Sequence, residues 1–102
     1  MTTAFRILAL SILGAALSGC GGPSDFKPAD SMSAAEIYVQ ACQVCHGEGG
    51  AGKFGFLFAI AGSEESAEQI AALLKEGGSI MPSFPQMSEQ QRLMMAGYVK
   101  GL

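Results

Sequence analysis

Two cysteines and a histidine stand together in one short motif, Cys42-Gln43-Val44-Cys45-His46, with the pattern C-x-x-C-H. Two thiols three residues apart at the end of a helix can each add across a vinyl group of a haem, which gives two thioether bonds. The histidine next in sequence is then held under the iron, where imidazole is a natural axial ligand. The motif therefore predicts one covalently attached haem c, with Cys42 and Cys45 as attachment sites and His46 as an axial ligand.

Other uses of this motif fit the sequence less well. A thioredoxin-like dithiol opens a helix that follows a strand, whereas this motif closes a predicted helix and no βαβ pattern is present. A zinc site of nitrogen and sulfur ligands needs a fourth ligand, but His46 is the only histidine and the third cysteine, Cys20, has another predicted role. A chance match to a five-residue motif is the remaining alternative, and the export signal described below argues against it.

The second axial position needs a ligand other than histidine. A thioether sulfur suits haem iron and raises its reduction potential. We favour Met81, which precedes a proline in an extended loop thirty-five residues after His46. Met87, directly before a predicted helix cap, is the fallback, and an open or water-bound site is the remaining alternative. Met94 and Met95 lie at core spacing on the last predicted helix, where methionine is an ordinary core filler.

The beginning of the chain is typical of an export signal, predicted over residues 1–19. Arg6 supplies the positive charge, and 7–17 is an apolar run of eleven residues, shorter than the roughly 20 that a membrane-spanning helix needs. The run ends in Leu17-Ser18-Gly19-Cys20, which resembles the lipobox of bacterial lipoproteins. An ordinary signal peptide with an incidental cysteine is the alternative. We expect a periplasm-facing lipoprotein of the bacterial cell envelope, anchored to a membrane through lipidated Cys20.

Charge and size limit the function of the remaining residues 20–102. They carry five Lys/Arg and nine Asp/Glu, a formal charge of −4, and the basic residues are scattered. This balance argues against nucleic acid as a partner and favours proteins with basic docking faces. A domain this small, with no cysteine left for a disulfide, is marginal on core burial alone and often needs a cofactor.

Three capping boxes predict three helices, because a serine is followed three residues later by Glu or Gln in each. The pairs are Ser33 with Glu36, Ser66 with Gln69, and Ser88 with Gln91. Ser63 is a second possible start for the middle helix, which ends at Gly77-Gly78. No strand pattern competes, so the predicted fold class is all-α, with three main helices and loops wrapped around one haem.

The segment between the export signal and the first helix differs in composition. Residues 21–31 contain Gly, Pro, Ser and Asp without a period, which is typical of a flexible tether with a reach of roughly 18 Å. The predicted organisation is a lipoprotein signal peptide at 1–19, a lipidated cysteine and flexible tether at 20–32, and one domain at 33–102.

From about Ser33 to Leu102 the sequence resembles a class I c-type cytochrome. The matching segments are 38–47, 78–84 and 87–91, followed by Tyr98-Val99. The resemblance implies that Met81, in a Met-Pro-x-Phe element, is the distal ligand. It also implies that the first and last helices cross closely. The residues expected at that crossing are the aromatic pair Tyr38 and Tyr98 and the small residues Ala34 and Ala96 or Gly97.

One departure from the family concerns the partner of the axial histidine. The family usually has a proline ten to twelve residues after that histidine, and its carbonyl accepts the imidazole N–H. This chain has Lys53-Phe54-Gly55-Phe56-Leu57-Phe58 there instead. We expect a carbonyl in 56–58 to take this role, since metal-bound histidines nearly always have such a partner. We interpret the three phenylalanines as haem-pocket wall, with an electron pathway or an exposed docking patch as alternatives.

Two filled axial positions would leave the iron able only to exchange electrons. We therefore expect a single-electron carrier between redox donor and acceptor proteins, and not an enzyme with a small-molecule substrate. The expected contact surface is a haem edge ringed by Gly47, Gly49 and Gly50. The alternatives are a haem-based gas sensor with a dissociable distal ligand and a fixed cytochrome subunit of a larger oxidoreductase. The lack of a second histidine argues against peroxidase chemistry.

Overall fold

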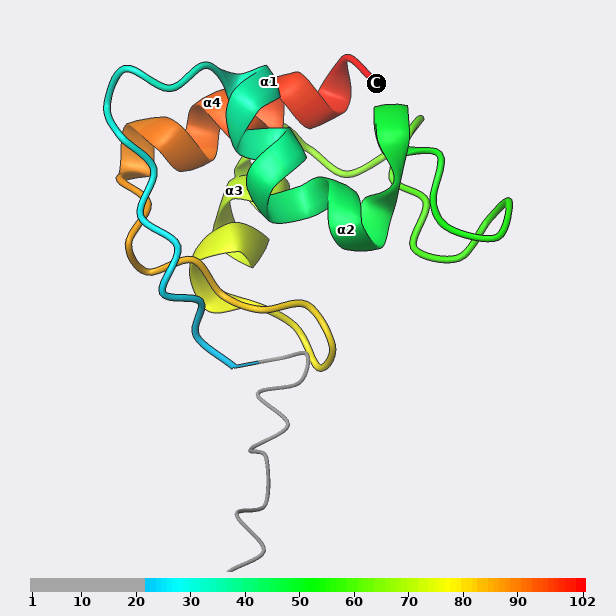
Figure 1. Ribbon diagram of the computed structural model, residues 1–102, viewed down its shortest axis with the longest axis horizontal. Coiled ribbons are helices and arrows are strands. Elements are labelled where there is room, and N and C mark those ends of the chain that lie inside the picture. The colour runs from blue at the N-terminus through cyan, green and yellow to red at the C-terminus, as the bar shows by residue number, and fades with distance from the viewer. Residues whose placement is uncertain (1–21) are drawn as a thin grey trace, which may run out of the picture.

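The computed structural model describes residues 22–102, which fold into three main helices joined by long loops (Figure 1). The elements in chain order are α1 (Ala34–Ile37), a π-helical turn η1 (Tyr38–Cys42), α2 (Gln43–His46), a 3-10 turn η2 (Glu48–Gly50), α3 (Ala67–Glu76) and α4 (Glu89–Lys100). The first three are continuous and form one main helix. Pairing of β type is confined, in this part of the chain, to two isolated bridges. The all-α prediction is confirmed; the export signal and Cys20 lie outside the described residues.

The helices begin where their capping boxes predict. Each capping serine accepts a hydrogen bond from the backbone N–H three residues later, and the Glu or Gln there accepts one from the serine N–H. The middle helix uses Ser66 as its cap, and Ser63 is not used. It ends at Gly77, whose φ of 73° is a left-handed conformation that glycine adopts without steric cost. Local sequence therefore determines both ends of α3.

The first helix widens directly before the C-x-x-C-H motif. The N–H of Gln43 donates to the carbonyl of Tyr38, five residues back, so η1 is a π-helical turn. Such turns occur frequently at functional sites. Cys42, the last residue of this turn, is buried and Cys45 is exposed, so the two thiols of the motif lie in different environments.

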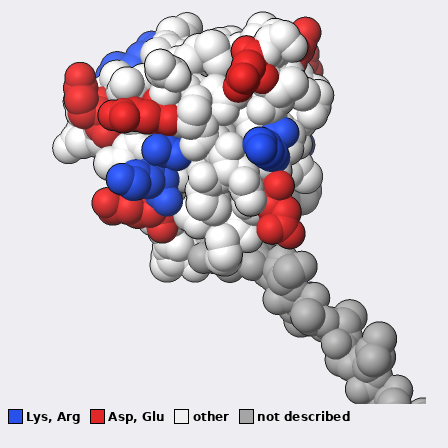
Figure 2. Space-filling model, turned by 90° about the vertical axis from the view of Figure 1, so that its left-hand side faces the viewer, with Lys and Arg blue, Asp and Glu red and all other residues white. Residues whose placement is uncertain are grey.

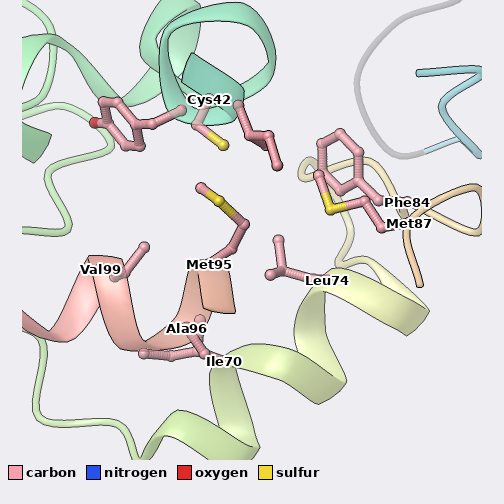
Figure 3. Packing of buried hydrophobic residues seen from close by; sticks show 10 residues of the cluster. Cys42, Ile70, Leu74, Phe84, Met87, Met95, Ala96 and Val99 are labelled. Atoms are coloured by element: carbon pink, nitrogen blue, oxygen red, sulfur yellow. The ribbon is translucent and has the colours of Figure 1, made fainter. Parts of the chain in front are cut away.

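The three main helices enclose a small buried cluster (Figure 3). Its members are Ile37, Tyr38, Cys42, Ile70, Leu74, Phe84, Met87, Met95, Ala96 and Val99. Both α1 and α3 pack against α4, and the rings of Tyr38 and Tyr98 join the first and last helices with centroids 5.4 Å apart. The predicted crossing and its aromatic pair are confirmed.

The last helix buries a narrower face than expected. Met95 is 1% exposed, as predicted, but Met94 is 39% exposed and the core role predicted for it is wrong. The buried stripe passes through Gln91, Met95 and Val99, four residues apart, and position 94 lies beside it. Ala96 is also buried, whereas Gly97 has open space in front of it, so Ala96 is the small residue that packs.

Residues 22–32 lie against the domain, where a flexible tether was expected. Ser24 N–H donates to the carbonyl of Ser83 (2.8 Å) and Ser83 N–H to the carbonyl of Gly22 (3.3 Å). The side chain of Phe26 packs against the buried cluster, and Pro28 is buried. Figure 1 shows this segment passing beside the loop that follows α3. None of the helices in 22–102 has the length and hydropathy needed to cross a membrane.

Candidate haem site

The C-x-x-C-H motif closes the first helix with two thiols in contrasting surroundings. Cys42 is 8% exposed and points into the buried cluster, toward Met95 in Figure 3. Burial, with a smaller contribution from the neighbouring charge of Cys45, raises the pKa of Cys42 to about 11. Cys45 is exposed, and neither sulfur is in a disulfide. Neither thiol is used in a disulfide, and one lies on the inner and one on the outer side of the helix end.

The imidazole of His46 is oriented by a backbone carbonyl. Its Nδ1 lies 2.6 Å from the carbonyl oxygen of Phe58. A carbonyl only accepts, so Nδ1 donates this hydrogen bond, and in the neutral ring this tautomer has its lone pair on Nε2. A hydrogen bond of this kind fixes both the tautomer and the ring orientation of a metal-binding histidine. The expectation that a carbonyl in 56–58 replaces the missing proline is confirmed, and the residue is Phe58.

The loop that supplies this carbonyl, residues 47–62, is called the His46 loop below. Lys53 and Leu57 exchange two backbone hydrogen bonds of 2.8 and 2.9 Å, which close a tight turn. Phe58 follows with φ of 60°, a left-handed backbone that costs a bulky residue about 1–3 kcal/mol. Phe54 and Phe56 occupy the tip and are 91% and 77% exposed. Neither of these two side chains belongs to the buried cluster, and their role as haem-pocket wall stays a prediction, whereas Phe58 contributes its backbone.

Glycines let the beginning of the His46 loop fold back onto the histidine. Gly47 ends the helix with φ of 76°, and a Cβ there would lie 2.2 Å from the carbonyl oxygen of Gly52. Gly52 N–H donates to the carbonyl of His46 (2.7 Å), and the Tyr38 hydroxyl donates to the carbonyl of Gly47 (2.6 Å). Burial raises the pKa of Tyr38 above its ordinary value, which keeps this donor protonated. The backbone around His46 is thus held from both sides.

The methionine favoured as distal ligand lies in residues 78–84, called the Met81 loop below. Met81 is half-buried and packs against the core cluster. Its carbonyl accepts from Gly78 N–H (2.9 Å), and Phe84 N–H donates to the carbonyl of Leu74 (2.7 Å) on α3. Met87, the fallback, is 2% exposed and lies beside Phe84 in Figure 3. Met87 is therefore enclosed by the packing of the core, whereas Met81 is only half-buried and lies in a loop that is bonded to α3.

The donor set fits haem better than the competing cofactors. Two thiols outside any disulfide and a histidine oriented through Nδ1 are what covalent haem attachment requires. Within residues 22–102 no group of three or more His, Cys, Asp or Glu side chains could hold a metal ion, so the zinc interpretation finds no site there. The helical fold, the motif and the methionine loop together define the class of c-type cytochromes.

Comparison with known proteins agrees with this class. Residues 29–99 match the family described as cytochrome c oxidase, cbb3-type, subunit III. This chain belongs to that family of cytochrome c domains. It therefore binds one haem c covalently and functions in haem-based electron transfer.

Two solved structures show the same fold. One is described as KustC0563 c-type cytochrome; it is 24% identical, the match covers 69% of this chain and 96% of that one, and the TM-score is 0.58. The other is described as a mutant of OmcF; it is 19% identical, with 70% and 95% covered and a TM-score of 0.56. No match was found among curated proteins.

Sequence reasoning missed several residues that shape the site. The hydroxyl of Tyr38 and the close approach of Gly52 are side-chain and backbone contacts with no motif of their own. The contact of Ser83 with residues 22–24 was missed because their composition is typical of a tether. One signal against a tether was Phe26, because a large apolar side chain in a fully solvated segment would have no apolar surface to pack against.

Proposed function

We propose that this chain is a membrane-anchored single-electron carrier with His/Met axial ligation. Cys42 and Cys45 would form the thioether bonds, and His46 and Met81 would be the axial ligands. The bound haem supplies an iron that gains and loses one electron. The observation that carries the proposal is the 2.6 Å hydrogen bond from His46 Nδ1 to Phe58, because it orients the ring and leaves Nε2 as the nitrogen available to the iron.

Each ligand role follows from the chemistry of the residue. Phe58 holds the imidazole ring in one orientation, so the histidine does not have to reorganise during electron transfer. The thioether of Met81 is a soft ligand that raises the reduction potential, and its loop is tied to α3. With both axial positions occupied, no position remains for a substrate, and the protein acts as a carrier and not as an enzyme.

The partners would be a redox donor and a redox acceptor protein. The net charge of −4 on residues 20–102 favours partners with basic faces. Figure 2 shows acidic and basic groups interspersed on one side of the molecule, with an uncharged area between them. Of the three glycines expected at the contact surface, Gly47 and Gly50 are buried and Gly49 is exposed, so we place the contact near Gly49.

The anchor would be a lipid on Cys20, which holds the protein on the periplasmic side of a membrane in the bacterial cell envelope. Gly22, whose carbonyl accepts from Ser83, follows Cys20 by two residues. Two residues span at most about 7 Å. The lipid would therefore attach close to the Met81 loop, and this end of the domain would lie nearest the membrane.

A second candidate is a fixed cytochrome subunit of a larger oxidoreductase. It is favoured by the description of the matching family, which names a subunit of a cytochrome c oxidase. The site chemistry is the same in both cases; the difference is whether the domain stays bound to one partner. Mild detergent extraction and size analysis separate them, since a carrier elutes alone and a subunit elutes with its complex.

The proposal is tested on the purified haem-loaded protein by redox titration and exposure to CO. We expect a reversible one-electron titration and a ferrous form that does not bind CO on the time scale of mixing, because Met81 occupies the iron. A ferrous protein that binds CO at once would overturn the carrier and favour the gas sensor.

A further inference from the structure

The backbone of Ser83, two residues after Met81, is bonded to the beginning of the described chain. Its N–H donates to Gly22 (3.3 Å) and its carbonyl accepts from Ser24 N–H (2.8 Å), and Pro23 forms a parallel bridge with it. We call residues 22–24 the strap. We propose that the strap positions the loop that carries Met81 and thereby restricts dissociation of this ligand.

The Met81 loop depends on the strap for its backbone contacts. Within the described residues, 79–83 make backbone hydrogen bonds outside the loop only with the strap. The Gly78–Met81 bond is internal to the loop, and the bond from Phe84 to Leu74 secures only its end. Ser83 is also tightly packed, because a Cβ on Gly77 would lie 2.8 Å from its nitrogen. The strap thus covers the part of the loop that α3 leaves free.

The segment that follows the strap is held in place by α4. The side chain of Gln91, a residue 8% exposed, lies 3.4 Å from the carbonyl oxygens of both Pro28 and Ala29. Phe26 N–H donates to the Ser24 hydroxyl (3.1 Å), and its ring packs against the core cluster. The segment therefore connects α4 to Ser83 as a continuous, fastened chain.

Fastening of this kind lowers the population of locally open states. Loops open with free energies set by the few contacts that close them. Removing one backbone hydrogen bond, at its net contribution to stability, raises the population of the locally open state about two- to tenfold. Since this inference rests on the proposed role of Met81, the open state would be the one in which its sulfur leaves the iron.

The test compares Ser24→Pro with Ser24→Ala in the full-length, haem-loaded protein. Both variants lose the hydroxyl that accepts from Phe26, but only the proline also loses the N–H that donates to Ser83. We measure the rate of CO binding to the ferrous protein, which requires the methionine to dissociate. We expect CO to bind about fivefold faster to Ser24→Pro than to Ser24→Ala. Equal CO-binding rates in the two variants would overturn the proposal that the strap restricts dissociation of Met81.

Two further measurements keep the test decisive. If Met81→Leu retains the weak long-wavelength sulfur–iron band, the ligand assignment fails and the role of the strap fails with it. If Ser24→Pro does not fold, amide exchange in the wild-type protein decides. The Ser83 amide, bonded to Gly22, must then exchange at least about fivefold more slowly than the Ile80 amide, which has no acceptor within 22–102. Similar exchange at both amides would overturn the proposal.

Discussion

The His46 loop and the Met81 loop are fastened in different ways. The His46 loop is bonded mainly within itself and to the helix directly before it, through Lys53 to Leu57 and through Gly52 to His46. Its last residue, Gly62, also donates to the carbonyl of Leu102 (3.3 Å). The Met81 loop is bonded to segments far away in sequence, above all through Ser83 to Gly22 and Ser24. The histidine side of the site is therefore built mainly by local contacts, and the methionine side mainly by contacts between distant segments.

This difference has consequences for stability and for ligand exchange. The His46 loop includes two strained residues, Phe54 and Phe58, with positive φ, so its backbone shape is maintained at an energetic cost. The Met81 loop contains no non-glycine residue with positive φ, but its position depends on contacts with distant parts of the domain. We therefore expect the methionine to be released first when the fold is weakened, while the histidine stays bound.

The largest effect on stability is expected in the His46 loop, for the substitution Gly47→Ala. The new Cβ would lie 2.2 Å from the backbone oxygen of Gly52, at a φ of 76°, so the loop must rebuild. We expect a loss of about 3 kcal/mol or more in unfolding free energy, measured by denaturant titration of the haem-loaded protein. The matched control is Gly49→Ala, with φ of 63° and open space in front of it, which should cost about 1 kcal/mol. Similar losses would show that this loop is not closely packed on itself.

A smaller effect, of a different kind, is expected from Gly77→Ala beside the Met81 loop. Its Cβ would meet the backbone nitrogen of Ser83 at 2.8 Å, at a φ of 73°. We expect a loss of about 2 kcal/mol together with a weakened sulfur–iron band. In the control Gly78→Ala, the nearest atoms are side-chain carbons of Leu73 and Met81, at 3.8 and 3.9 Å, and the band should be unchanged. A weakened band in both variants would contradict the role given to the Gly77 contact.

The smallest effect is expected from Tyr38→Phe, which removes the donor to Gly47 and keeps the ring next to Tyr98. We expect a loss of about 1–2 kcal/mol, because the buried carbonyl loses its partner. The control Tyr98→Phe should cost less than about 0.5 kcal/mol, since its hydroxyl has no hydrogen-bond partner in the described part of the chain. Equal losses of unfolding free energy in the two variants would show that the Tyr38 hydroxyl does not stabilise the His46 loop.

The Tyr38 contact also predicts a dependence on pH. Burial raises the pKa of Tyr38 above its ordinary value of 10.0, so the fold favours the neutral phenol. Its stabilising contribution is fully present below pH 10 and is lost as pH rises through the raised value. Unfolding titrations between pH 8 and pH 11 should show the stability difference between wild type and Tyr38→Phe shrinking at the alkaline end. A constant difference across this range would contradict the buried, neutral state of the hydroxyl.

The parts that could be predicted from the sequence are those that local interactions decide. Ser33, Ser66 and Ser88 cap the helices as predicted, because a capping box involves only four consecutive residues. The C-x-x-C-H motif occupies the end of the first helix for a similar reason. The position of the histidine acceptor within 56–58 was predicted, but its identity depends on the left-handed backbone of Phe58, which no residue type there requires.

The remaining parts depend on contacts across long separations. Residues 22–32 have the composition of a tether, and they are ordered because Ser83 and Gln91 provide hydrogen-bond partners about sixty residues away. The exposure of Met94 depends on which face of α4 the other two helices cover. The π-helical turn at Tyr38–Cys42 has no sequence signal of its own, although it ends in the first cysteine of the motif.

The most direct test of the central claim, His46/Met81 ligation, is an optical spectrum of the haem-loaded wild type and two matched variants. Met81→Leu and Met87→Leu both remove a sulfur and keep a similar volume. We expect low-spin c-type bands with the weak long-wavelength sulfur–iron band in the wild type and in Met87→Leu. Met81→Leu should lose this band and bind CO readily. Loss of the band in Met87→Leu alone, or a wild type that is already high-spin and CO-reactive, would contradict the account.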